Sequence, residues 1–289
     1  MTFKEKLSSD AKILTTEIGP PKGISLDKIL SEVAPLRNRV DAVNATDMQS
    51  SVMRMSSFAA CVLLKQHGFE PILQVTCRDR NRLALQSDIL SAAALDIRNI
   101  LALTGDHPTL GDHPEAKPVF DLDSVQLIEV LRRLQTGEDM NANKLSGPVP
   151  APQFCVGAVV NPGADPLEPE IIKMEKKLEA GAEFFQTQAV YDVRVFEKFL
   201  DASKHLKTNI LAGIVLLKSE RMAQYMNENV PGVFVPEDII NEMRRAQDKK
   251  AKCVEIASRL IIELKKMCRG VHIMPIGWYG VVPAVLDAI

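Results

Sequence analysis

Aromatic residues are scarce in this chain of 289 residues, at 5% of the sequence with a single Trp. So few rings argue against the base-stacking platforms by which proteins hold single-stranded nucleic acid. The formal net charge is −2 and the pI is about 6.2, so a basic surface for nucleic acid or anionic membrane is also lacking. We therefore expect no nucleic-acid partner.

Long apolar runs and paired cysteines are missing as well. No stretch reaches the roughly 18 apolar residues of a membrane span, so none is expected. Residues 1–10 are polar and lack the apolar segment of a signal peptide, which predicts a cytoplasmic protein. No C-x-x-C pair occurs, so neither a metal site nor a disulfide framework is indicated. We expect buried thiols in a reducing compartment at Cys61, Cys77, Cys155, Cys253 and Cys268.

What the chain does contain is a regular alternation of strand-like and helix-like segments. This alternation predicts a parallel sheet, and eight strands is the number that closes a (β/α)8 TIM barrel. An open doubly wound sheet is the alternative, but no G-x-G-x-x-G or P-loop follows any strand. We read residues 1–289 as one domain, with 137–152 as a long loop. The expected strands are 11–16, 39–44, 71–75, 99–103, 154–160, 183–188, 210–216 and 271–275.

Polar residues stand where these strands end. Active sites of parallel α/β folds lie at that edge, and in a barrel the strand ends converge on one rim. The rim offers carboxylates, amides, hydroxyls and one amine, but neither a nucleophile triad nor a cluster of His ligands. It suits polar recognition of a heterocycle with one carboxyl acid or base. Its members are Glu17, Thr46, Gln74, Thr76, Thr104, Gly105, Asp106, Asn161, Gln188 and Lys218.

Each of these residues also has a purely structural interpretation. Asp106 fits an ordinary turn after its strand, and Glu17 fits a solvated loop carboxylate. The period of two places Gln186 and Gln188 on one face, where either a ligand or a buried amide ladder would satisfy them. The basic run of 78–82 is interpreted as a solvated charged segment rather than a phosphate grip.

The strand ends also carry motifs of a known family. These are TEIGPP at 16–21, LTGD at 103–106, EAGA at 179–182 and FQTQ at 185–188, the last followed by Tyr191 and Asp192. In this order and spacing the chain resembles, over nearly its whole length, the catalytic domain of methylenetetrahydrofolate reductase. That domain is a flavin-dependent (β/α)8 barrel that reduces 5,10-methylenetetrahydrofolate to 5-methyltetrahydrofolate.

The resemblance implies roles for particular residues. Glu17 falls on the general acid that opens the imidazolidine ring, Asp106 on a carboxylate near flavin and folate, and Gln188 on a folate-contacting amide. The implied cofactor is FAD, with FMN as the alternative. Its expected contacts are Thr46, Gln74, Leu103, Thr104, Gly105 and Asp106, with Glu170 and Lys177 toward the ribityl or adenosine part.

The source of electrons is less defined by the resemblance. Some members place an aromatic ring against the nicotinamide where this chain has Glu220, and some bacterial members take electrons from a partner subunit. We expect either NAD(P)H or such a subunit as donor, and a homo- or hetero-oligomer. A non-redox pterin-binding or methyl-transfer barrel subunit is the alternative function.

Overall fold

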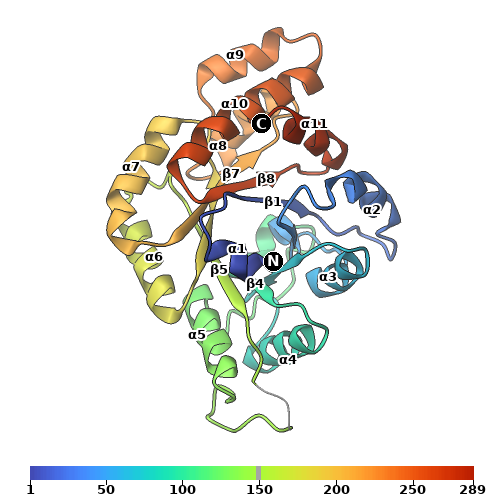
Figure 1. The fold of residues 1–289 in the computed structure, drawn as a ribbon, viewed down its shortest axis with the longest axis vertical. Coiled ribbons are helices and arrows are strands. Elements are labelled where there is room, and N and C mark those ends of the chain that lie inside the picture. The colour runs from blue at the N-terminus through green and yellow to red at the C-terminus, as the bar shows by residue number, and fades with distance from the viewer. Residues whose placement is uncertain (148–150) are drawn as a thin grey trace.

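A closed barrel of eight parallel strands forms the centre of the protein (Figure 1). The structure is a computed structural model that describes residues 1–147 and 151–289. Each strand pairs with the next along the chain, and the last pairs with the first, so the predicted (β/α)8 TIM barrel is confirmed over an open sheet. The strands are β1 (Ile13–Ile18), β2 (Ala42–Ala45), β3 (Pro71–Thr76), β4 (Asn99–Leu103), β5 (Cys155–Val160), β6 (Phe184–Ala189), β7 (Asn209–Val215) and β8 (Gly270–Met274).

Helices surround the barrel and bury their apolar faces against its outer surface (Figure 1). Local signals set several of their ends. The Asp123 carboxylate accepts from the Gln126 amide at 2.9 Å and begins α5, while Gly181 takes a left-handed φ of 119° and ends α6. The helices are α1 (Phe3–Leu7), α2 (Asp27–Val33), α3 (Ser57–Gln66), α4 (Arg82–Ala94), α5 (Ser124–Gln135), α6 (Glu168–Ala180), α7 (Val193–Ser203), α8 (Glu220–Asn229), α9 (Glu237–Arg245), α10 (Lys249–Met267) and α11 (Val282–Asp287).

Helix α1 closes the amino-terminal end of the barrel, and Figure 1 shows it within the ring of helices. Its Phe3 and Leu7 are buried in a cluster with inward-facing strand residues. The Phe3 ring meets the Phe184 ring edge-on, with centroids 5.3 Å apart. Because apolar side chains fill this end, the polar residues of the barrel lie toward the carboxyl ends of the strands.

Three local expectations were wrong. Strand β1 begins and ends two residues later than predicted, so Glu17 lies inside β1 rather than after it, and β2 begins three residues later than predicted. Helix α3 begins at Ser57, not at residue 53, because the Met53 amide donates to Asp112 in another loop at 2.9 Å. The segment 281–289, for which the sequence predicts only a short apolar tail, contains α11.

The buried face of α3 also differs from the expected one. The sequence pattern predicts a helix over 53–67 with Met55, Phe58, Ala59 and Val62 on one face. The residues that α3 buries are instead Ser57, Ala60, Cys61 and Leu64. The spacing is helical in both sets, and the buried one is fixed by packing against β2 and β3.

Candidate active site

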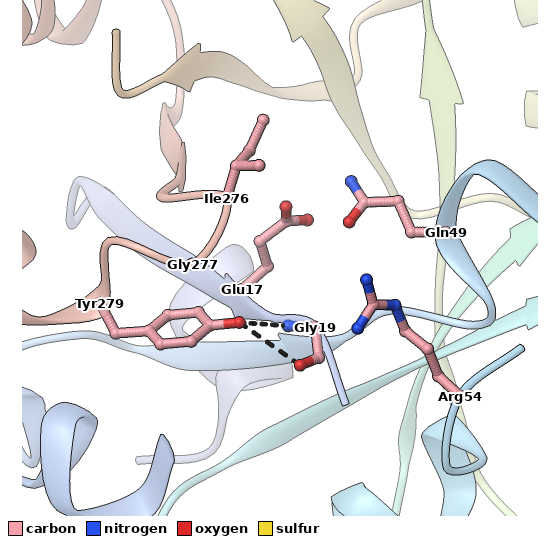
Figure 2. Close-up of a pocket in the computed structure, with 7 residues that line it drawn as sticks. All are labelled: Glu17, Gly19, Gln49, Arg54, Ile276, Gly277 and Tyr279. Atoms are coloured by element: carbon pink, nitrogen blue, oxygen red, sulfur yellow. Dashed lines mark hydrogen bonds between the residues drawn. The ribbon is translucent and has the colours of Figure 1, made fainter. Parts of the chain in front are cut away.

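A polar cavity of about 170 Å³ opens at the carboxyl ends of β1 and β8 (Figure 2). Figure 2 shows the Glu17 carboxylate facing this space, with the Arg54 guanidinium and the Gln49 amide across from it and the Tyr279 ring at one wall. Gly19, Ile276 and Gly277 complete the lining, so the cavity joins the ends of β1, β2 and β8. Its lining consists of Glu17, Gly19, Gln49, Arg54, Ile276, Gly277 and Tyr279.

Glu17 is the buried carboxyl of this cavity, with 6% of its surface exposed. It lies one residue before the end of β1, where it pairs in register with Asn44 of β2. Its Oε2 lies 3.6 Å from Nε2 of His272 on β8. The interpretation of Glu17 as a solvated loop carboxylate is therefore wrong, because strand β1 carries it into the barrel mouth.

His272 is held from its other ring nitrogen. Its Nδ1 lies 2.9 Å from the Thr15 hydroxyl and 3.3 Å from Nε2 of Gln186, and the histidine is 3% exposed. An amide nitrogen can only donate, so Nδ1 is an acceptor and the ring proton of neutral His272 is on Nε2. That N–H is on the side of the ring that approaches Glu17.

Gln186 and Asn44 orient each other beneath this pair. The Asn44 amide donates to Gln186 Oε1 at 2.7 Å, and Gln186 Nε2 donates to Asn44 Oδ1 at 3.2 Å. With both amides oriented in this way, Gln186 presents its Nε2 to His272. The sequence predicted that Gln186 and Gln188 share one face of their strand. Gln186 is buried in this network, whereas Gln188 is exposed.

The rim residues of β4 lie outside the Glu17 cavity. Gly105 has a φ of 95°, and a Cβ there would lie 3.1 Å from the side chains of Arg78 and Thr76, so glycine is required. The Thr104 hydroxyl accepts from the Ser124 amide at 3.2 Å, and Leu103 is partly buried. Asp106 is exposed, and its carboxylate has no hydrogen-bond partner within residues 1–147 and 151–289.

Two further residues of the predicted site are Thr46, which follows β2, and Gln74, which lies within β3. Thr46 is 2% exposed, and its hydroxyl has no partner in the described part of the chain, which leaves a buried polar atom available to a ligand. Gln74 is 9% exposed, and its backbone carbonyl accepts from the Ser57 hydroxyl of α3 at 2.8 Å.

The basic run after β3 is only partly solvated: Arg78 is buried and Arg80 is half-buried, contrary to the prediction, whereas the other residues of 78–82 are exposed. Arg78 is 2% exposed and binds the Asp79 carboxylate through two nitrogens, at 2.8 to 3.0 Å. Arg80 pairs with the buried carboxylate of Asp47. Only Arg82, which pairs with Asp121 on the surface at 2.9 Å, fits the prediction. Asp79 is the next residue in the sequence after Arg78, whereas Arg80 and Arg82 reach carboxylates 33 and 39 positions away.

Arg78 also connects the loops around the rim. Its Nη1 donates to the Ser51 hydroxyl at 3.0 Å and to the backbone carbonyl of Asp106 at 3.4 Å, and Nη2 donates to the Met48 carbonyl at 3.4 Å. The Ser51 hydroxyl binds the same Asp106 carbonyl at 2.9 Å. Arg78 therefore fixes the backbone that presents the Asp106 carboxylate.

Glu170 and Lys177 are engaged within the protein. The Asn161 amide donates to Glu170 Oε1 at 3.0 Å, and Lys177 Nζ donates to the Val159 carbonyl at 2.7 Å. Burial lowers the pKa of Lys177, and the nearby Glu170 charge partly opposes this shift. Both side chains stabilise the end of β5, and a ligand would have to share or displace these bonds.

Sequence reasoning missed His272, Asn44 and Asp47. The first two lie inside strands whose apolar neighbours gave the strand signal, and alternation with a period of two was the available clue that they face the interior. Asp47 follows Thr46 and accepts from the amide and hydroxyl of Thr76 at 2.8 and 2.9 Å. Nothing in its local sequence distinguishes it from a turn residue.

Neither a metal-binding cluster nor a membrane-spanning helix occurs among the described residues. Among residues 1–147 and 151–289, no group of three or more His, Cys, Asp and Glu side chains is arranged to hold a metal ion. No helix of the described residues is long and apolar enough to cross a membrane.

Fold and site together define a class: a (β/α)8 barrel with a buried carboxyl and a histidine at the carboxyl ends of its strands. The chain belongs to the methylenetetrahydrofolate reductase family, whose model matches residues 2–289. The confirmed resemblance thus covers nearly the whole sequence.

Relatives agree with this assignment at low identity. Methylenetetrahydrofolate reductase 2 of Schizosaccharomyces pombe is 24% identical over 281 residues, which cover 91% of this chain and 42% of that protein. A probable NADPH-dependent methylenetetrahydrofolate reductase of Caenorhabditis elegans is 24% identical over 221 residues, 71% of this chain and 30% of that protein. The chain thus spans less than half the length of these relatives.

Two solved structures share the fold. A Clostridium thermocellum protein that binds two copies of 5-methyl-5,6,7,8-tetrahydrofolic acid aligns with a TM-score of 0.65 at 16% identity, covering 99% of this chain and 98% of that one. A 2,3-dimethylmalate lyase of the PEP mutase/isocitrate lyase superfamily aligns with a TM-score of 0.56 at 11% identity, covering 99% and 85%. At these identities the two structures support the barrel fold alone.

Proposed function

We propose that this chain reduces 5,10-methylenetetrahydrofolate to 5-methyltetrahydrofolate with a bound flavin, and that Glu17 is the general acid. The observation that carries the proposal is the buried Glu17 carboxyl beside His272 in a polar cavity at the barrel mouth. Membership of the methylenetetrahydrofolate reductase family supports the choice of substrate.

The rim offers groups that fit a flavin. The Thr46 hydroxyl is buried without a partner in the described residues, Gly105 lets the backbone approach a ligand closely, and Asp106 presents a free carboxylate. We propose that the flavin is FAD and that a flavin bound here supplies the hydride for the reduction. The residues proposed to hold it are Thr46, Gln74, Leu103, Thr104, Gly105 and Asp106, with Glu170 and Lys177 toward its ribityl or adenosine part.

The protein itself supplies the proton that the reaction needs. Glu17 donates it to N10 of the folate as the bond between N10 and the methylene carbon breaks, which leaves an iminium at N5 whose carbon accepts the hydride. The Nε2–H of His272 faces the Glu17 carboxylate that remains and stabilises its negative charge. Gln188 and Asp106 orient the pterin, and the Asp106 charge favours the developing cation.

Glu220 bears on the electron donor. Where some family members have an aromatic ring, Glu220 begins α8 and pairs with Arg244 at 3.5 Å. A charged pair offers the nicotinamide no flat apolar surface. We therefore propose an electron-transfer partner subunit ahead of NAD(P)H, in a cytoplasmic assembly of two or more chains.

A non-redox role in binding or transferring the methyl group of a folate is the second candidate. It is favoured by the structural neighbour that binds 5-methyltetrahydrofolic acid. The two candidates differ in one property, because only the reductase needs a tightly held flavin.

The experiment that separates them uses flavin-loaded protein reduced without oxygen. Mixed with methylenetetrahydrofolate, it should reoxidise, seen in flavin absorbance, and release 5-methyltetrahydrofolate. Glu17→Gln should keep flavin but slow this step by about 100-fold or more, whereas Glu129→Gln, an exposed carboxylate on α5, should match the wild type. A protein that binds neither FAD nor FMN would favour the second candidate, and full activity of Glu17→Gln would remove Glu17 from its role.

A further inference from the structure

Tyr279 makes a contact across the barrel mouth, between the chain that follows β8 and the chain that leaves β1. It begins the short 3-10 helix η5 (Tyr279–Val281) after β8, and its ring forms one wall of the Glu17 cavity (Figure 2). The Gly19 amide donates to the Tyr279 hydroxyl at 2.9 Å, and the hydroxyl lies 3.4 Å from the Gly19 carbonyl, to which it can donate in return. One hydroxyl thus satisfies both backbone groups of Gly19.

The segment that leaves β1 depends on this contact because of its sequence. Gly19 is followed by Pro20 and Pro21, which have no N–H, so the Gly19 amide is the one backbone donor of the three residues. The carbonyls of the two prolines accept the other hydrogen bonds of this segment: Arg54 donates to the Pro20 carbonyl at 3.1 Å and the Met55 amide to the Pro21 carbonyl at 2.8 Å. Both donors come from the loop between β2 and α3, so it is Tyr279 that connects this segment to the chain after β8.

Strand pairing does not provide that tie. The ladder between β1 and β8 runs from Ile13 opposite Gly270 to Thr16 opposite Ile273 and stops there. Glu17 and Ile18 pair only with β2. The seam between β1 and β8 is therefore unpaired at the level of Glu17, and the Tyr279 contact closes it two residues further on.

This seam is where the two proposed acid–base groups face each other. Glu17 comes from β1, whereas His272 comes from β8, seven residues before Tyr279. The chain after β8 is turned back over the cavity by Ile276 and Gly277, which have φ values of 45° and 80°. That turn brings the Tyr279 hydroxyl onto Gly19.

We propose that Tyr279 is a positioning residue for Glu17: by holding Gly19, it fixes the end of β1 against β8 and sets the approach of the Glu17 carboxyl to His272 and to bound substrate. The proposal rests on the function proposed above. Burial raises the pKa of Tyr279, and Glu17 raises it further while Arg54 lowers it. The hydroxyl therefore stays protonated at neutral pH and retains both hydrogen bonds.

The test removes the hydroxyl alone, with Tyr279→Phe. A matched control exists in Tyr191→Phe, since the buried Tyr191 hydroxyl donates to the Val215 carbonyl at 2.8 Å, away from Glu17. Loss of the two hydrogen bonds to Gly19 predicts that Tyr279→Phe lowers the rate of substrate reduction by about 3- to 10-fold. Its pH–rate profile should shift while flavin affinity stays unchanged, and Tyr191→Phe should change neither.

A double variant distinguishes this proposal from the one on which it rests. If Tyr279 acts through Glu17, Glu17→Gln with Tyr279→Phe should be no slower than Glu17→Gln alone. Independent, multiplicative losses would overturn the positioning role while leaving Glu17 as the acid. A Glu17→Gln variant of full activity would instead count against the proposed function.

A second measurement needs neither flavin nor turnover. Amide hydrogen exchange in the ligand-free protein should be about 3- to 10-fold faster at Gly19 in Tyr279→Phe, and unchanged there in Tyr191→Phe. Equal exchange at Gly19 in the wild type and Tyr279→Phe would mean that the hydroxyl does not hold the end of β1, and the proposal would fail whatever the activity.

Discussion

Nε2 of His272 lies 3.6 Å from Oε2 of Glu17, although the two residues are 255 positions apart in the sequence. The approach follows from barrel closure, since β8 pairs with β1 and places His272 opposite Thr15, two residues before Glu17. The histidine proton faces Glu17 because Gln186 occupies the other ring nitrogen. The carboxyl thus has the Nε2 edge of the His272 ring beside it.

Replacing His272 should therefore slow the proton-dependent step. We expect His272→Gln to lower the rate of methylenetetrahydrofolate reduction by at least about tenfold, because the Glu17 carboxylate left after proton transfer loses its donor. Flavin content should not change. His205→Gln is the control, since His205 pairs with Glu175 on the surface at 2.8 Å. Unchanged turnover in His272→Gln would show that the pair is structural only.

Thr46→Val tests the flavin site through a hydroxyl that has no partner in the described chain. Removing a buried, unsatisfied hydroxyl should leave the melting temperature of the flavin-free protein unchanged or raise it. If the hydroxyl binds flavin, the Kd for flavin should rise by about 3- to 10-fold. Thr16→Val should instead lower the melting temperature and leave the Kd for flavin unchanged, because the Thr16 hydroxyl donates to the Ile273 carbonyl at 2.9 Å. Unaltered flavin affinity in Thr46→Val would exclude that contact.

Arg78 should contribute more to stability than its surface neighbour Arg82. Arg78→Met leaves Asp79 without its bidentate partner and frees the backbone of Asp106, so we expect a loss of about 2–4 kcal/mol in the free energy of unfolding. Arg82→Met removes an exposed pair with Asp121 and should cost less than about 1 kcal/mol. Urea denaturation measures both losses of unfolding free energy, and equal losses would contradict the inference that Arg78 fixes the backbone of Asp106.

The sequence predicted the barrel well and the depth of its site poorly. Alternation of apolar runs and helices identified all eight strands, because burial between barrel and helices leaves a strong local pattern. It placed the end of the first strand before Glu17, since a carboxylate in a strand interior is costly unless partners exist. The partner, His272, comes from another strand, and the register that brings the two together is not encoded locally.

The arginines after β3 show the same limit. Three basic residues within five positions are usually solvated, and Arg82 is. Arg78 is buried and Arg80 is half-buried because acceptors lie beside them, among them Asp47, which follows the end of β2. That match depends on which strand ends become neighbours on the rim, a property of the closed barrel rather than of the segment.

Gly157 should be irreplaceable within β5. A Cβ at this position would overlap the ring of Phe184 on β6, which fills the lower barrel against Phe3. Gly157→Ala should therefore cost about 1–3 kcal/mol of unfolding free energy through overpacking. Gly23→Ala is the control, because no atom lies within 4 Å of its added Cβ. A melting temperature as high as that of the control would mean that Phe184 repacks at little cost.

The five cysteines should be inert in the folded protein. All are buried and free, and burial raises the pKa of Cys77 and of Cys253 to about 12. A raised thiol pKa means that the reactive thiolate is almost absent at pH 8, so folded protein should react with a thiol reagent only as fast as it opens. In denaturant all five should react at once. Rapid labelling of any cysteine at pH 8 without denaturant would contradict the burial, and mass spectrometry of the labelled peptide would identify the exposed position.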